Sequence, residues 1–278
     1  MTSYLIFLEV LDGCFRCERA GIKKALDNFV SQKRTNNYNY GIPYDVGSIM
    51  HYGSKAFSSN KKPTMVPKDV LYTKTLGSPF ISFYDLLMLN RHYNCTGYLN
   101  LLRTYMFILE EHCKTCLDRC DHSKTVCYLE GFPHPRDCSK CICPGGYGGV
   151  DCKQRPAGCG EEFTATSYPQ VFHANVGRKS FGAKPREDYD KCHYWIKAPL
   201  KKRIEVKLLS FSPNGIAVDG CRSGGVEIKT QVDQRLTGYR FCSMADANIT
   251  LVSDFYIVPI ITYNRVYETG VSIQYRHL

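Results

Sequence analysis

Several features that would assign this sequence to a common protein class are missing. No apolar run reaches the roughly 18 residues that a membrane span needs, so we expect no membrane-spanning segment. The phosphate-binding patterns G-x-G-x-x-G and G-x-x-x-x-G-K-[ST] are absent, which leaves nucleotide chemistry without support. The net charge is +10, but the basic residues are scattered in short runs such as 201–203, so we predict no nucleic-acid partner. The single tryptophan, Trp195, is expected in a core.

The histidines do not follow the spacing of a catalytic metal site. None of the eight histidines precedes residue 51, and no two of them form an H-x-x-x-H pair. They are His51, His92, His112, His122, His134, His173, His193 and His277. A catalytic zinc site needs about three protein ligands plus a water, and this spacing does not provide them on one helix.

Cysteine, by contrast, is abundant and clustered. Eight of the 15 cysteines lie within residues 113–152, a density typical of disulfide-stapled modules. Disulfides persist in oxidising compartments, so we predict a secreted or extracellular protein, with glycosylation expected at the sequons of Asn94 and Asn248. The apolar stretch 4–8 is too short for an export signal, and we therefore expect the given start not to be the natural one.

Local patterns predict helices in the first part of the chain and strands in the last. Helical spacing of apolar residues appears over 22–30, and the Ser82/Asp85 pair forms a capping-box pattern before a second helix with Phe83, Leu86, Leu87 and Tyr93 as its stripe. Residues 97–109 are interpreted as a helical connector, with unspliced sequence as the alternative. From about residue 162, alternation at 203–208, 226–229 and 271–276 predicts half-buried antiparallel strands of a β-sandwich.

The most informative stretch is Pro43-Tyr-Asp-Val-Gly-Ser-Ile-Met-His-Tyr52. It resembles the Met-turn of the astacin family of zinc metalloendopeptidases. The blocks at 63–69 and 82–95 resemble that family in order and spacing. With the downstream modules, the arrangement is similar to nematode-type astacins that carry EGF-like and CUB domains.

The resemblance implies a metzincin catalytic domain that cleaves extracellular peptide bonds with zinc. Met50 takes the place of the apolar floor beneath the metal, and Tyr52 that of a further ligand that stabilises the oxyanion. The H-E-x-x-H-x-x-G-x-x-H helix that holds zinc and supplies the general base is missing. We therefore expect an N-terminal truncation, no cofactor in this chain and no activity. In the family, the cysteine that corresponds to Cys95 pairs with one near the start of the catalytic domain, and we expect that start to be missing here.

The cysteine cluster ends in C-x-C-x-x-G-Y-x-G-x-x-C over 141–152, which resembles the end of an EGF-like module. The module's usual pairing implies the bridges Cys120–Cys138, Cys127–Cys141 and Cys143–Cys152. Cys113 and Cys116 stay unassigned, as do Cys14 and Cys17. An alternative is a zinc ribbon built on Cys113-x-x-Cys116 and Cys138-x-x-Cys141.

The tail resembles a CUB domain, on the evidence of Tyr194–Pro199, Gly224–Ile228 and the strand Gly270–Tyr275. The resemblance implies the bridges Cys159–Cys192 and Cys221–Cys242. Many CUB domains bind calcium, but Ser223-Gly224-Gly225 stand where such a domain shows Asp and an aromatic residue. With only Asp219 and Glu187 as weak candidates, we predict no calcium site.

Together these patterns predict a multidomain α+β protein. Residues 1–20 are unassigned, 21–96 form the Met-turn half of an astacin-like catalytic domain, 97–112 a connector, 113–153 an EGF-like module and 159–278 an all-β CUB sandwich. The predicted function is secreted zinc endopeptidase by resemblance, acting on extracellular proteins or peptides, with matrix or protein partners bound through the EGF-like and CUB modules. The alternative is a non-catalytic extracellular binding protein.

Overall fold

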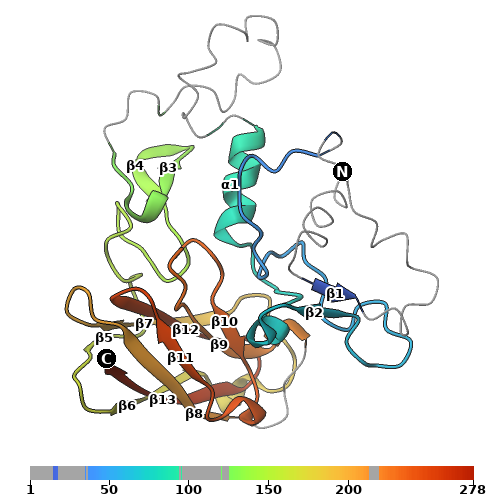
Figure 1. Cartoon of the computed structure of the whole chain (residues 1–278), viewed down its shortest axis with the longest axis vertical. Coiled ribbons are helices and arrows are strands. Elements are labelled where there is room, and N and C mark those ends of the chain that lie inside the picture. Colours follow the sequence, from blue (N-terminus) through green and yellow to red (C-terminus); the bar gives the residue numbers. More distant parts are fainter. Residues whose placement is uncertain are drawn as a thin grey trace, which may run out of the picture.

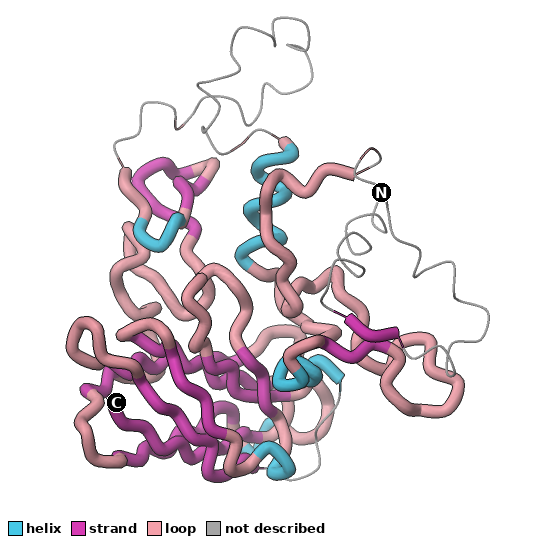
Figure 2. Tube along the Cα trace, in the orientation of Figure 1, coloured by secondary structure: helices cyan, strands magenta, loops and turns pink. Residues whose placement is uncertain are grey.

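The computed structural model describes residues 15–17, 35, 37–93, 95, 120, 125–212 and 219–278. The helix expected over 22–30 and the connector at 97–109 lie outside these residues, as do Cys14, Cys113, Cys116 and Asn94. Within the described part, no helix is long and apolar enough to cross a membrane. The architecture is mostly β (Figures 1 and 2).

Residues 162–277 fold into two packed sheets, as the alternating pattern predicted. One sheet has the strand order β10-β9-β12-β7-β5 and the other β11-β8-β13-β6. The bounds are β5 Glu162–Thr164, β6 Gln170–Gly177, β7 Asp190–Lys197, β8 Ile204–Ser212, β9 Gly224–Ile228, β10 Tyr239–Phe241, β11 Thr250–Ser253, β12 Ile257–Asn264 and β13 Glu268–His277.

The core of this sandwich lies between the two sheets. On β8 and β13, buried and partly exposed residues alternate, because successive side chains of a strand point to opposite faces. Ile196, Ile204, Val206, Ile260 and Ile273 are among the fully buried side chains. One pair departs from the expected antiparallel arrangement, since β5 runs parallel to β7.

The expectation for β9 was wrong in one respect. We predicted that Glu227 and Lys229 would face solvent, but both are buried, and every residue of β9 is buried as well. The outer face of this sheet is covered by residues 71–80, whose Leu71 and Phe80 pack against the sandwich core. A second layer therefore buries the face that alternation alone assigns to water.

The covering layer comes from residues 37–95. It contains β2 Met65–Pro67, the 3₁₀ helix Val70–Lys74 and α1 Phe83–His92, while β1 Phe15–Cys17 pairs with β2. Helix α1 begins as predicted, because Ser82 and Asp85 form a reciprocal capping box. Phe83 and Leu87 are buried on its inner face, whereas Tyr93 is exposed at the C-cap, because the helix ends at His92.

A small disulfide-linked region joins the two layers. It contains the 3₁₀ turn Tyr128–Glu130, β3 Phe132–His134 and β4 Asp137–Ile142, drawn in green in Figure 1. Trp195 of β7 is buried against this region: its indole N–H donates to the Gly146 carbonyl at 2.7 Å, and its ring packs on Tyr147. The described residues contain five disulfides, Cys120–Cys138, Cys127–Cys141, Cys143–Cys152, Cys159–Cys192 and Cys221–Cys242. They are the pairs that the EGF-like and CUB resemblances imply.

Candidate functional site: the turn at residues 45–52

The stretch that carries the Met-turn resemblance forms two consecutive turns. The Ser48 amide donates to the Asp45 carbonyl at 3.1 Å, and the His51 amide donates to the Ser48 carbonyl at 3.0 Å. The Ser48 hydroxyl also accepts the Met50 amide at 3.1 Å. Serine suits this position because its short side chain bonds to backbone two residues on.

Asp85, in the first turn of α1, holds the middle of this segment. Its carboxylate accepts from the Ser48 hydroxyl at 2.5 Å and from the Ile49 amide at 3.1 Å. The same carboxylate accepts the Ser82 amide at 2.8 Å as part of the capping box. One carboxylate therefore fixes both the start of the helix and the turn beside it.

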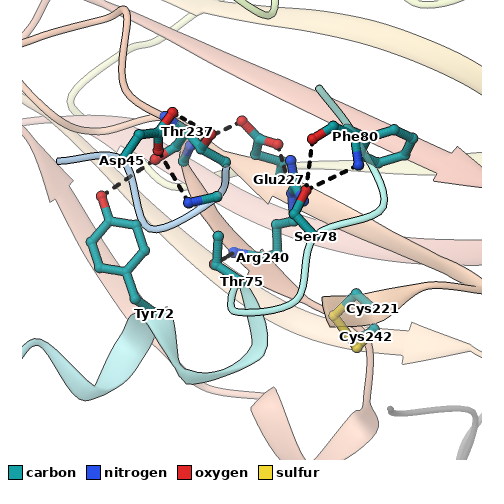
Figure 3. Close-up of polar contacts among 12 residues, drawn as sticks. Asp45, Tyr72, Thr75, Ser78, Phe80, Cys221, Glu227, Thr237, Arg240 and Cys242 are labelled. Atoms are coloured by element: carbon teal, nitrogen blue, oxygen red, sulfur yellow. Dashed lines mark hydrogen bonds and ion pairs between the residues drawn. A yellow bond between two sulfur atoms is a disulfide. The ribbon is translucent and has the colours of Figure 1, made fainter. Parts of the chain in front are cut away.

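Asp45 holds the start of the segment, and its partner belongs to the β-sandwich (Figure 3). Its carboxylate accepts from the Thr237 amide at 3.2 Å, from the Thr237 hydroxyl at 3.0 Å and from the Gly47 amide at 3.1 Å. Burial raises the pKa of Asp45, while these donors from Gly47 and Thr237 oppose the shift. The pair is buried between two parts of the chain that are 192 positions apart.

The side chains at the end of the turn differ in exposure. Tyr52 is 37% exposed and its ring packs edge-on against Phe57. His51 is buried, and its Nδ1 lies 2.6 Å from the Tyr52 carbonyl, to which it donates a hydrogen bond. Burial lowers the pKa of His51 to about 4, so the ring is neutral at pH 7. Met50 is partly buried, and its neighbour Ile49 is exposed.

Comparison with known proteins identifies the segment around this turn. The family profile described as Astacin matches residues 17–94, slightly before the boundary expected at 21. The protein is 42% identical over 253 residues to the Caenorhabditis elegans protein named zinc metalloproteinase nas-31, covering 90% of this chain and 37% of that protein. It is 34% identical over 255 residues to zinc metalloproteinase nas-32 of the same organism, covering 90% and 35%. The chain belongs to the astacin family.

This astacin chain spans just over a third of the length of these two relatives. Among solved structures, it is similar to the CUB1-EGF-CUB2 domain of human MASP-1/3, with a TM-score of 0.29, 15% identity and 58% of each chain covered. It is also similar to the Ca²⁺-bound CUB2 domain of MASP-1, with a TM-score of 0.27, 13% identity, and 41% and 96% of the two chains covered.

The residues that the structure describes do not form a site for the zinc that the astacin family uses. Within the described ranges, no three His, Cys, Asp or Glu side chains gather closely enough to hold a metal ion. The Nδ1 of His51 donates to the Tyr52 backbone carbonyl. Among the residues of the turn, the family resemblance gives a ligand role to Tyr52. The alternative zinc ribbon is excluded for Cys138 and Cys141, because both are in disulfides.

Asp219 and Glu187, the two weak calcium candidates, lie in different environments. Asp219 accepts from the Ser54 hydroxyl at 2.8 Å and from the Lys55 amide at 3.3 Å, which ties the sandwich to the segment after the Met-turn. Glu187 is an exposed loop residue. Asn248, the described sequon residue, is exposed next to β11.

Sequence reasoning missed residues 230–238, in the loop between β9 and β10 of the sandwich, which contact both α1 and the disulfide-linked region. Asp233 accepts from the Tyr84 hydroxyl of α1 at 2.6 Å, and Gln234 accepts from the Tyr147 hydroxyl at 2.9 Å. Arg235 bridges Asp233 and Glu130. Leu236 packs with Phe83, Leu87 and Phe132 in a shared cluster. Because the partners outside the loop are 87 to 149 positions away, no local pattern marks this loop.

Proposed function

We propose that the protein acts in extracellular peptide-bond hydrolysis as an astacin-type zinc metalloendopeptidase, and that residues 21–96 are the Met-turn part of its metzincin-type catalytic domain. The observation that carries the proposal is the astacin match over 17–94 together with a turn held from three sides. In this proposal Met50 is the apolar floor of the site. Tyr52 presents a partly exposed phenol that can donate a hydrogen bond to a developing oxyanion.

The remaining parts serve recognition in this proposal. Residues 113–153 are an EGF-like module and residues 159–278 a CUB domain, which bind protein substrates or matrix partners, while 97–112 connect them to the catalytic part. Five disulfides in the described residues support an oxidising, extracellular setting. The exposed side chain of Asn248 is accessible for glycosylation, as proposed also for Asn94.

The chain as given is proposed to be inactive, because a water nucleophile needs a metal held by about three ligands and a general base. The test is casein digestion by the purified chain with zinc supplied. We expect the purified chain to show no chelator-sensitive digestion of casein. Tyr52→Phe, purified identically, is the matched control, because a contaminating protease digests casein equally in both preparations. Chelator-sensitive digestion that falls in Tyr52→Phe would contradict the proposed inactivity.

A second candidate is a non-catalytic extracellular binding protein that works through its EGF-like and CUB modules. It is favoured by the missing H-E-x-x-H pattern and the lack of a metal-holding group among the described residues. The transcript upstream of Met1 distinguishes the two. An in-frame H-E-x-x-H-x-x-G-x-x-H supports the peptidase, whereas a start codon followed by an export signal supports the binding protein.

A further inference from the structure

The β-sandwich holds the entry of the Met-turn by more than one hydrogen bond. Thr237 donates twice to Asp45, and the backbone of Gly47 runs directly against the Thr237 side chain. A Cβ placed on Gly47 would lie 2.2 Å from the Thr237 methyl group, so only glycine fits this approach. The start of the turn is therefore fixed by polar contact and by shape.

The same sandwich also holds the exit of the turn. Asp219 accepts from the Ser54 hydroxyl and the Lys55 amide, and its Cβ lies 3.1 Å from where a Cβ on Gly53 would stand. Between these two points, Asp85 of α1 holds Ser48 and Ile49. Two of the three anchors of the turn thus come from the sandwich.

A buried ionic layer keeps the sandwich in register with the segment that carries the turn (Figure 3). Arg240 of β10 donates to Glu227 of β9 at 2.8 Å and to the Ser78 hydroxyl at 2.5 Å. The Arg240 amide donates to the Thr75 hydroxyl at 3.0 Å, and the Gly238 amide donates to Glu227 at 2.9 Å. Buried charges tolerate little displacement, because each loses its partner when the geometry shifts.

From these contacts we propose that Thr237 and Asp219 are positioning residues for the Met-turn: the CUB-like sandwich sets the places of Met50 and Tyr52 through Asp45 and Ser54. That this placement serves a reaction rests on the proposed function. That the sandwich places the turn is independent of the proposed function, because it concerns the conformation of residues 45–55 alone. Thr237 and Asp219 act through the residues that flank the turn, one at its entry and the other at its exit.

The test is the ¹³C-methyl NMR spectrum of methionine in the full chain, which contains six methionines. Met50→Leu assigns the Met50 signal, and Met244, in the turn Met244–Asp246 of the sandwich, reports on the sandwich itself. We expect Thr237→Val, Asp219→Asn and Gly47→Ala each to shift or broaden the Met50 signal and to leave Met244 in place. Thr237→Ser keeps the donating hydroxyl and is expected to keep the wild-type Met50 signal.

Hydrogen exchange measured by mass spectrometry gives the second readout. In Thr237→Val and Asp219→Asn, we expect the amides of residues 45–55 to exchange roughly tenfold faster, and those of β12 and β13 to be unchanged. The matched controls are Thr250→Val, on the exposed edge strand β11, and Asp188→Asn, in an exposed loop. Both are expected to resemble the wild type.

Two results would overturn the proposal. An unchanged Met50 signal in all three variants would show that the turn keeps its place without the sandwich. Simultaneous changes at Met244 and in β12 would show general destabilisation in place of positioning. Casein digestion plays no part in either readout, so failure of the proposed function and failure of this inference are separately visible.

Discussion

His51 shows how a single residue inside the Met-turn ties its conformation to pH. The ring is buried, packs edge-on against Tyr44 and donates to the Tyr52 carbonyl. Burial lowers its pKa from 6.5 to about 4 in the folded protein. At a pH between these two pKa values, His51 is therefore protonated in the unfolded chain and neutral in the folded chain. The stability contributed by neutral His51 is present above pH 6.5 and is lost as pH falls toward 4.

We therefore predict acid destabilisation that His51→Phe reduces. Between pH 7 and pH 5, the free energy of unfolding should fall by about 2 kcal/mol through His51 alone. His193 on β7 adds to the wild-type slope, since burial lowers its pKa also to about 4. The slope should shrink in His51→Phe without vanishing. Urea unfolding at both pH values measures this, with His173→Phe, an exposed ring on β6, as the matched control. Equal slopes in His51→Phe and wild type would contradict the assignment.

Strand β9 illustrates which elements sequence patterns can predict. Helix α1 and strands β8 and β13 follow from local signals, because the capping box and the alternation lie within each element. The outer face of β9 cannot be predicted in this way, because residues 71–80 cover it from far along the chain. Glu227 is buried at this face and forms an ion pair with Arg240. Although burial pushes its pKa upward, Arg240 and Lys229 hold the pKa of Glu227 below its ordinary value.

This pairing predicts a marked effect of Arg240→Met. Removing the guanidinium leaves Glu227 buried without its main partner, which typically costs about 3–5 kcal/mol of the free energy of unfolding. Adding Glu227→Gln keeps the oxygen that accepts from Gly238 and removes the stranded charge. We expect the double variant to recover about 1–2 kcal/mol relative to Arg240→Met, as measured by urea unfolding at pH 7.

The control for this cycle is the pair Arg276 and Glu205, a partly exposed ion pair on the other sheet. Arg276→Met is expected to cost about 1 kcal/mol or less, because water screens the charge that remains. A double-variant cost equal to the sum of the Arg240→Met and Glu227→Gln costs would show that the two buried residues do not interact.

At the scale of the whole molecule, the sequence predicts only those residues of the candidate site that belong to a recognisable motif. Met50 and Tyr52 follow from the order of residues in the Met-turn. Thr237 and Asp219 do not, because their partners lie 192 and 165 positions away and polar residues in loops carry no signal of a distant contact. The sandwich, the disulfide-linked region and the astacin segment meet at the loop 230–238 and share one apolar cluster there.

Zinc content is the measurement that tests the central claim most directly, because it asks whether a Met-turn held in place is also a metal site. The purified full chain is equilibrated with zinc, dialysed against buffer free of metal and analysed for metal by mass spectrometry. We predict far less than one zinc per chain, and no change in the midpoint of urea unfolding on adding zinc. One tightly held zinc per chain, lost in Tyr52→Phe, would contradict the account.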